Sequence, residues 1–316
     1  MSVLILTGEH DPSADLMVSA LEKREAIVHR VDTSWFPGQL SVTAELASGR
    51  WCGTLRTPHR TIDLDTITAV WYREPKAFDF PEMTPTERMH ANIEAKYGLG
   101  GILTTLPVLW VNHPARVADA AYKPVQLVAA HRAGLTVPDT LLTNEADAAR
   151  EFGRRGRTVT KMLGGVSLVE EGTRRYARTR LLDPSDFEDM RGLERTMHQF
   201  QRWASKAKEV RVVAIGDQLN AIEIHAHSAK AYVDYRSDYR SLRYQLTDLP
   251  ESVEVGVRQL MKHLGLLYGA IDFVVGPTNE WTFLEINPSG QYGWLENHTD
   301  APLTDQLADL LAGGTA

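Results

Sequence analysis

The sequence predicts an α/β protein with more than one sub-domain, and three observations support this prediction. The chain has 316 residues, of which 43% are hydrophobic, so it is long enough for two or three sub-domains around substantial cores. The first third alternates apolar runs with helical patterns, as open α/β layers do. The last third has several strand-like runs, then a helical pattern, a hairpin and a final helical pattern.

Short local signals predict the N-terminal elements. Residues 3–7, VLILT, form an apolar run that is typical of a strand. Asp11 followed by Pro12 is an N-cap with proline at the first helical position, and residues 13–25 carry apolar side chains at helical spacing. A second apolar run, AIVHRVD at 26–32, predicts the next strand, which gives the order β-α-β.

Three further elements complete the first sub-domain, which we expect to close around residue 115. The run ITAVWYREP predicts a strand that ends in Tyr72-Arg73. We expect a core tyrosine and an exposed arginine there, and contact with a substrate is the alternative. An amphipathic helix near 85–105 and a strand in PVLWVNHP at 107–114 follow.

The middle of the chain predicts a helix and several short strands. The helix runs from Pro124 to Ala133 and stops at Gly134, after which Val-Pro turns the chain into a strand. Residues 157–183 have the pattern of short strands around a loop rich in glycine and charge.

The last third predicts strands in EVRVVAIG at 209–216, LNAIEIHAHS at 219–228 and AYVDYR at 231–236. A helix follows, then a hairpin, then a closing helix near 303–312. One face of the first of these helices carries Val253, Val257, Leu260, Met261 and Leu264.

Composition and missing motifs exclude several classes of protein. The net charge of −7 comes without a basic stripe, so we expect no nucleic-acid partner. The longest apolar run, GILTTLPVLWV, is far shorter than the roughly 20 residues of a membrane span, and the N-terminus lacks the features of a signal peptide. We therefore expect a cytoplasmic protein with no membrane partner. A P-loop, a GxGxxG fingerprint, a GxSxG elbow and an HExxH motif are all absent.

The segment IDFVVGPTNEWTFLEINP predicts a hairpin with oxygen ligands on one face. Pairing Gly276 with Trp281 sets Asp272 opposite Glu285, and Asn287 shares their face by the period of two. Carboxylate and amide oxygens suit Mg²⁺, which completes its shell with water and substrate phosphates. Pairing of either acid with an arginine is the alternative. The opposite, core-facing side is expected to carry Ile271, Phe273, Leu284 and Ile286.

Three cations precede this hairpin in the chain and are of the kind that meet phosphates. Lys123 stands at the head of a helix, Lys161 ends a strand, and Arg211 stands alone on one face of an apolar strand. For each of them a solvated surface charge is the alternative. After Lys161 comes a glycine loop with Gly164, Gly165 and Gly172, whose backbone N–H groups we expect near an anion.

This order of residues resembles the ATP-grasp superfamily of carboxylate-activating ligases. The stretches that carry the resemblance are KPVQLVAAHRAGLTVPDTLLTN, FQRW…KEVRVVAIGDQLNAIEI and AIDFVV…WTFLEINPSGQYGW. More narrowly, TGEHDPSADLMVSAL, VWYREP, VDYRSDYRSLRY and NPSGQYGWLE resemble the graspetide synthetases, which are ATP-grasp ribosomal peptide maturases of the microviridin type and their actinobacterial relatives. The resemblance implies an N-terminal sub-domain (1–115), a central one (116–195) and a C-terminal one (196–316), with ATP clasped between the last two.

The resemblance also implies roles for individual residues. Lys123 and Lys161 would contact the phosphates of ATP, and Arg211 would face the γ-phosphate and the developing acyl phosphate. The adenine would meet the hinge strand, and Mg²⁺ would meet the acidic hairpin. The hinge residues are Gln201, Arg202 and Trp203, and the metal ligands are Asp272, Glu285 and Asn287. Met162 replaces the proline that is common after the second lysine, so the closure of the phosphate loop is an open point.

The implied activity is ATP-dependent formation of ester or amide cross-links between side chains of a ribosomal precursor peptide, through an acyl phosphate. We expect Arg236 to hold the peptide carboxylate with Asp234 orienting it, and a structural Asp-Arg pair is equally compatible with the sequence. The alternatives are a ligase that appends a free amino acid or joins small peptides, and a nucleotide-binding peptide carrier without catalysis. Homodimers are usual in such enzymes, so we expect one here.

Overall fold

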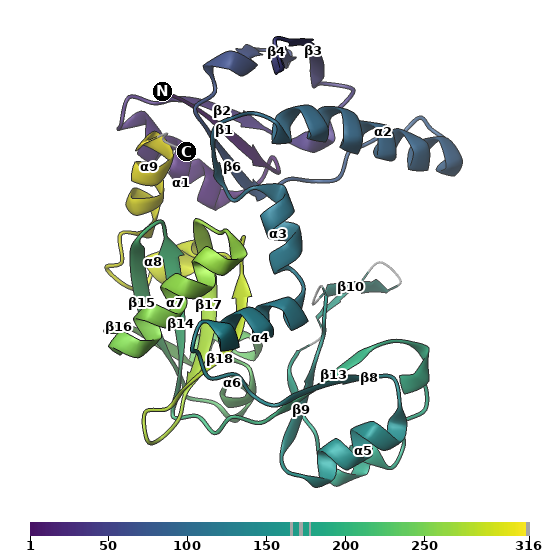
Figure 1. Cartoon of the computed structure of the whole chain (residues 1–316), viewed down its shortest axis with the longest axis vertical. Coiled ribbons are helices and arrows are strands. Elements are labelled where there is room, and N and C mark those ends of the chain that lie inside the picture. The colour runs from purple at the N-terminus through teal and green to yellow at the C-terminus, as the bar shows by residue number, and fades with distance from the viewer. Residues whose placement is uncertain (165–166, 171–172, 177, 314–316) are drawn as a thin grey trace.

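The computed structural model describes residues 1–164, 167–170, 173–176 and 178–313, and its fold is the mixed α/β type that the sequence predicts (Figure 1). In the described part of the chain no helix is both long and apolar enough to span a bilayer. Three sheets matter for the site: one N-terminal, one central and one C-terminal.

The N-terminal sheet is parallel, with the strand order β2-β1-β6-β7. Its strands are β1 (Ser2–Thr7), β2 (Ile27–Val31), β6 (Ala69–Glu74) and β7 (Leu109–Val111). The helix α1 (Pro12–Glu22) starts as predicted, because the Asp11 carboxylate accepts the N–H groups of Ser13 and Ala14. The helix α2 (Pro85–Thr104) starts with a capping box between Thr84 and Glu87.

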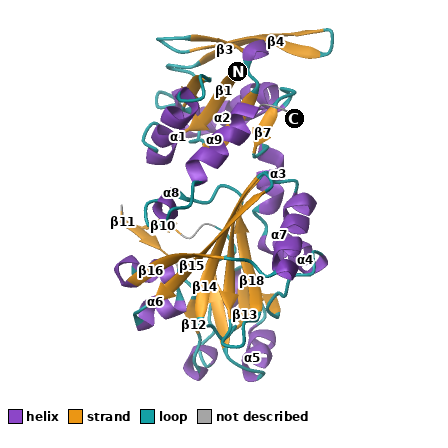
Figure 2. Cartoon of the chain, turned by 90° about the vertical axis from the view of Figure 1, so that its left-hand side faces the viewer, coloured by secondary structure: helices purple, strands orange, loops and turns teal. Residues whose placement is uncertain are grey.

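The two faces of this sheet are covered by different parts of the chain. Val3 and Ile5 pack with α1 and with the last helix, α9 (Leu303–Gly313). Leu4 and Leu6 pack with α2 and with a small antiparallel sheet that the sequence did not predict. This small sheet consists of β3 (Ser41–Ala47), β4 (Arg50–Arg56) and β5 (Thr61–Asp63), and Figure 2 shows it at the top of the molecule.

The central sheet is antiparallel and has the order β12-β9-β13-β8. It contains β8 (Thr140–Thr143), β9 (Thr158–Lys161), β12 (Arg180–Leu181) and β13 (His198–Arg202), with α5 (Ala146–Arg154) against it and a separate hairpin of β10 (Ser167–Glu170) and β11 (Thr173–Tyr176). Two helices, α3 (Pro114–Ala120) and α4 (Lys123–Arg132), lead into it. The strand β13 follows residue 195 and yet pairs with β8 and β9. The division of the chain at 115 and 195 stays a prediction.

The C-terminal sheet is antiparallel, with the order β16-β15-β14-β17-β18. Its strands are β14 (Lys208–Ile215), β15 (Gln218–Ala226), β16 (Leu242–Thr247), β17 (Tyr268–Val275) and β18 (Trp281–Asn287). The helix α7 (Glu251–Leu264) covers one face and buries all five side chains predicted to form its apolar stripe. A short helix, α8 (Gly293–Glu296), precedes α9.

The strand predicted in AYVDYR is wrong. The segment forms α6 (Ala229–Val233) and a 3-10 turn over Tyr235–Ser237. Two local caps explain this: the Ser228 hydroxyl accepts the N–H of Ala231, and the Asp234 carboxylate accepts the N–H of Arg236. On the side of β15 away from β14, the strand that pairs with it is β16, further along the chain.

Candidate functional site

The central and C-terminal sheets lie next to each other in the lower half of Figure 2. A cavity of about 220 Å³ between them is lined by most of the predicted site residues. Its walls come from β9 and β13 on one side and from β14, β17 and β18 on the other, with the start of α4 beside them. Nine predicted residues line it: Lys123, Lys161, Gln201, Arg202, Trp203, Arg236, Asp272, Glu285 and Asn287. The tenth, Arg211, lies next to the cavity, where it contacts Asp272.

Asp272 and Glu285 form a cross-strand pair in the acidic hairpin, as predicted, although the strands pair in another register near the hairpin loop. Trp281 pairs with Val275 and not with Gly276, and a β-bulge next to Phe273 then restores the predicted pair. The bulge changes which side chains face the core. Phe283 is buried there, whereas Leu284, predicted to be core, lines the cavity beside Glu285.

Each of the two carboxylates is surrounded by cations. Arg236 Nη2 lies 2.7 Å from Asp272 Oδ2 and 3.4 Å from Glu285 Oε1. Lys123 Nζ forms an ion pair with Glu285, and Arg211 Nε lies 3.6 Å from Asp272 Oδ1. Burial alone raises the pKa of Glu285, but Lys123, Lys161 and Arg236 outweigh burial and lower it, so the acid is ionised at neutral pH.

Lys161 lies among both the cations and the carboxylates of the cavity. Its Nζ lies 3.5 Å from the carbonyl oxygen of Leu284. Its pKa is lowered to about 8, mainly by burial, with Lys123 and Arg236 acting in the same direction and Glu285 and Asp272 acting against them. Among the residues that the structure describes, six cations and four carboxylates line the cavity, and this surplus of positive charge favours a polyanionic ligand.

The acidic residues also fit a divalent cation. One guanidinium nitrogen of Arg236 reaches both carboxylates, so their oxygens converge on a common point. Asn287 is exposed to the cavity, and its Oδ1 accepts the N–H of Ser289 at 3.1 Å. Among the residues that the structure describes, no group of three or more His, Cys, Asp or Glu side chains is placed to hold a metal. A cation here would rest on two carboxylates and one amide, a donor set that suits Mg²⁺.

The predicted hinge residues lie at the cavity, but their side chains already have partners. Gln201 Nε2 donates to Thr140 Oγ1 at 2.9 Å. The guanidinium of Arg202 donates to Thr158 and to the carbonyl of Phe152 and lies over the Phe152 ring. The backbone N–H groups of Arg202 and Trp203 also donate within the central sheet and its flanking chain, so a purine at this edge would use other groups.

Arg211 is buried and held from several sides. Its Nη1 donates to the hydroxyl of Tyr235 at 2.6 Å, and its guanidinium lies over the Trp294 ring. Although burial alone lowers its pKa, Asp272 and Tyr235 raise the pKa of Arg211 above its usual value. A Cβ atom on Gly290 would stand 2.6 Å from the Cβ of Ala270 and 3.2 Å from Arg211 Nη2, so this loop can approach Arg211 only with glycine.

The prediction of an exposed Arg73 is wrong. Its side chain is 2% exposed, whereas Tyr72 beside it is half-buried. Arg73 Nε lies 3.4 Å from the Asp11 carboxylate, and Nη1 donates to the carbonyl of Ser289, which belongs to the loop after β18. No local pattern predicts this contact, because Arg73 and Ser289 are 216 residues apart in the chain.

Sequence reasoning also missed several cavity residues. Val159, Val274 and Leu284 supply an apolar lining, and Lys206 forms an ion pair with Glu209 at the wall. Alternation along β9 and β17 is the only signal that points to the two valines. Of the predicted glycine loop, Gly165 and Gly172 lie outside the described residues.

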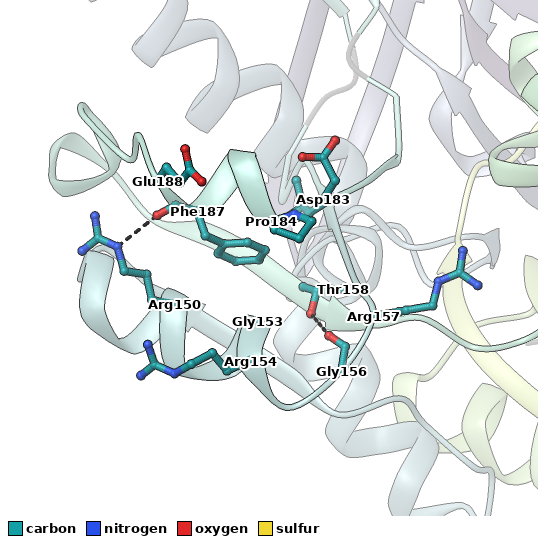
Figure 3. Close-up of a pocket in the computed structure, with 11 residues that line it drawn as sticks. Arg150, Gly153, Arg154, Gly156, Arg157, Thr158, Asp183, Pro184, Phe187 and Glu188 are labelled. Atoms are coloured by element: carbon teal, nitrogen blue, oxygen red, sulfur yellow. Dashed lines mark hydrogen bonds between the residues drawn. The ribbon is translucent and has the colours of Figure 1, made fainter.

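A second hollow of about 450 Å³ lies between α5 and residues 182–188 and contains none of the predicted residues (Figure 3). Its arginines have partners of their own. Arg150 donates to the carbonyl of Phe187 and pairs with Asp147, and Arg154 pairs with Glu151. The surplus of positive charge therefore marks the first cavity as the candidate site.

Comparison with known proteins agrees with this site. The family model described as the MvdD pre-ATP-grasp domain matches residues 2–118. No curated protein matches the chain. Among solved structures, the RiPP-associated ATP-grasp ligase of Chryseobacterium gregarium, in complex with ADP and a leader and core peptide, is 27% identical, with 100% of this chain and 97% of that chain covered and a TM-score of 0.91.

Two macrocyclases from Microcystis aeruginosa MRC are also similar. MdnC, bound with the precursor peptide MdnA, is 28% identical over 99% of this chain and 100% of its own, with a TM-score of 0.88. MdnB is 30% identical over 98% of both chains, with a TM-score of 0.81. On this likeness across the whole chain, and as the sequence motifs predicted, the chain belongs to the ATP-grasp ribosomal peptide maturases, the graspetide synthetases.

Proposed function

We propose that this chain is an ATP-dependent ligase that cross-links side chains within a ribosomal precursor peptide by ester or amide bonds. The observation that carries the proposal is the single cavity in which Asp272 and Glu285 converge among a surplus of cations. Relatives bound to ADP and to precursor peptides support it. Neither alternative, a ligase for free amino acids or a carrier without catalysis, has an observation in its favour.

In this proposal, different residues of the chain bind the phosphates of ATP and the metal ion. Lys123 and Lys161 are proposed to bind the phosphates, with Arg211 behind Asp272 to offset the negative charge that develops on phosphoryl transfer. Asp272, Glu285 and Asn287 are proposed to hold Mg²⁺, which offsets charge on the phosphates when it is bound. ATP supplies the phosphoryl group that activates a peptide carboxylate. In this proposal it is clasped between the central and C-terminal sub-domains, 116–195 and 196–316.

Arg236 is proposed to bind the acidic side chain of the peptide. It is half-buried at the cavity wall, and its backbone N–H and Nη1 both face Asp234 Oδ1, at 3.0 and 3.7 Å. Burial in a water-poor site strengthens a guanidinium–carboxylate contact and slows hydrolysis of an activated acid. Its present ion pairs with Asp272 and Glu285 show that it can reach carboxylates on this side of the cavity.

Mass spectrometry of the precursor peptide tests the proposal directly. Incubation with the enzyme, ATP and Mg²⁺ is expected to remove one water for each cross-link formed. A ligase for free amino acids would instead add the mass of a residue, and a carrier would change neither the peptide nor the ATP. A peptide of unchanged mass, with no release of ADP, contradicts the proposed function.

A homodimer and a cytoplasmic location also belong to the proposal. The homodimer is expected because such enzymes are usually homodimers, and the cytoplasmic location follows from the sequence analysis. Sedimentation over a range of concentrations tests the first, and a single species with the mass of one chain would contradict it. Fractionation of cells that express the protein tests the second.

A further inference from the structure

The backbone around Asn287 is held by buried side chains that come from distant parts of the chain. On one side lies Ile286, whose carbonyl accepts from Gln126 Nε2 at 2.9 Å and whose N–H donates to Gln126 Oε1 at 3.1 Å. Gln126 is 4% exposed, and its amide also donates to the carbonyl of Ala120. One glutamine of α4 therefore fixes both polar groups of the residue between Glu285 and Asn287.

On the other side of Asn287, Asn112 holds the next residue. Its Nδ2 donates to the carbonyls of Pro288 and Tyr268, both at 2.8 Å. Its Oδ1 accepts the N–H groups of Leu267 and Tyr268 at 2.8 and 3.0 Å. All four hydrogen-bonding positions of this amide are used, so its orientation is fixed by the contacts themselves.

Arg73 extends the same arrangement by one residue. Its Nη1 donates to the carbonyl of Ser289 at 2.8 Å. Asn112 directly follows β7, and Arg73 lies near the end of β6. Side chains at the carboxyl edge of the N-terminal sheet therefore donate hydrogen bonds to the loop after β18. Ile286, Pro288 and Ser289 each have a carbonyl bound by a buried side chain, while the side chain of Asn287 between them is exposed.

We propose that Gln126, Asn112 and Arg73 are positioning residues that fix the backbone of Glu285 and Asn287 and so set the geometry of the metal end of the nucleotide site. The inference rests on the proposed function. Its physical reason is that ligand oxygens must be held within a fraction of an ångström, and the end of a strand holds such positions only with support from the residues around it. A role in stability alone is the competing explanation, and a thermal measurement alone does not separate the two.

The test compares Gln126→Met with a matched control, Gln306→Met. Gln306 is a half-buried glutamine of α9 that exchanges side-chain hydrogen bonds with Asn220, away from the cavity. Calorimetry measures the affinity for ATP with and without MgCl₂, and thermal unfolding is recorded for each protein. In Gln126→Met the gain in affinity from Mg²⁺ is expected to fall about 10- to 100-fold, with metal-free affinity retained.

Two outcomes overturn the proposal. If Gln126→Met and the control are destabilised alike, and both keep the gain from Mg²⁺ seen in the wild type, the contacts are structural only. If the variant does not fold, hydrogen exchange on the wild-type protein decides. The amides of Ile286 and Tyr268 are expected to be protected before nucleotide is added, and rapid exchange at Ile286 contradicts a pre-set backbone. A wild type with protected amides that binds no ATP contradicts the proposed function instead.

Discussion

The substitution Glu285→Gln tests whether Glu285 is a metal ligand or only a counter-ion for the neighbouring cations. The substitution keeps the shape of the side chain and removes one negative charge among Lys123, Lys161 and Arg236. At the 3.4 Å between Arg236 Nη2 and Glu285 Oε1, the gross attraction is roughly 5 kcal/mol at an effective dielectric constant of about 20. Desolvation offsets much of it, and a charged hydrogen bond contributes about 2 kcal/mol net.

The expected effects on stability and on binding differ in sign. Loss of about 2 kcal/mol lowers the Tm of the nucleotide-free protein by roughly 3 °C in a chain of this size. Metal-free ATP binds as well or better, because one carboxylate no longer repels the phosphates. The gain in affinity on adding Mg²⁺, and the cross-linking of the peptide, are expected to be lost because a ligand is missing.

Calorimetry at constant ionic strength, with and without MgCl₂, measures both affinities, and differential scanning calorimetry measures Tm. Glu280→Gln is the matched control. Glu280 lies in the loop of the same hairpin, is exposed and accepts hydrogen bonds from Thr278. A Glu285→Gln protein with reduced Tm but an unchanged response to Mg²⁺ refutes the reasoning, since Glu285 would then serve only to balance Lys123 and Arg236.

Three further predictions test other parts of the site. The pKa of Lys161 is lowered to about 8, and a bound phosphate raises this pKa, so we expect the affinity for ATP to be full below pH 8 and to fall as the pH rises above 8. Lys161→Arg should flatten this pH dependence. A wild-type Kd that does not change with pH would contradict the prediction. Tyr235→Phe removes the hydroxyl that accepts from the buried Arg211, so we expect Tm to fall by a few degrees and kcat for cross-linking to fall up to about tenfold; an unchanged kcat would place the hydroxyl outside the reaction. Leu260→Ala, in the buried face of α7, is expected to cost about 2–5 kcal/mol in thermal unfolding while KM for ATP stays unchanged, and a raised KM would link that core to the cavity.

Local signals explain the parts of the fold that the sequence predicted. Asp11 caps α1, and the stripe from Val253 to Leu264 faces the core, because both depend on neighbours within one turn or one helix. The pair Asp272 and Glu285 follows from a short hairpin. Most site residues could be predicted for the same reason. They lie on regular strands or at the start of a helix, where the spacing of apolar residues predicts which face each side chain occupies.

The rest depends on contacts that no local pattern contains. The bulge beside Leu284 adds one residue to a strand whose apolar run reads equally well without it. Arg73 is buried and donates a hydrogen bond to a carbonyl 216 residues away in the chain. The side chains of Asn112 and Gln126 donate to backbone carbonyls that are more than 150 residues away. The β3–β5 sheet is recognisable only from its packing on the N-terminal core.

The position of α9 has a consequence for how the protein is made. Its side chains Leu303, Leu307 and Leu311 share a core with Met17 and Leu21 of α1, and Arg24 pairs with Asp305 and Asp309. During translation α1 alone covers that face of the first sheet, so part of its apolar surface stays exposed to solvent until residues 303–313 have been synthesised and can pack on it. We expect this delay to make early chains dependent on chaperones and to bring the whole molecule to its native state late and together.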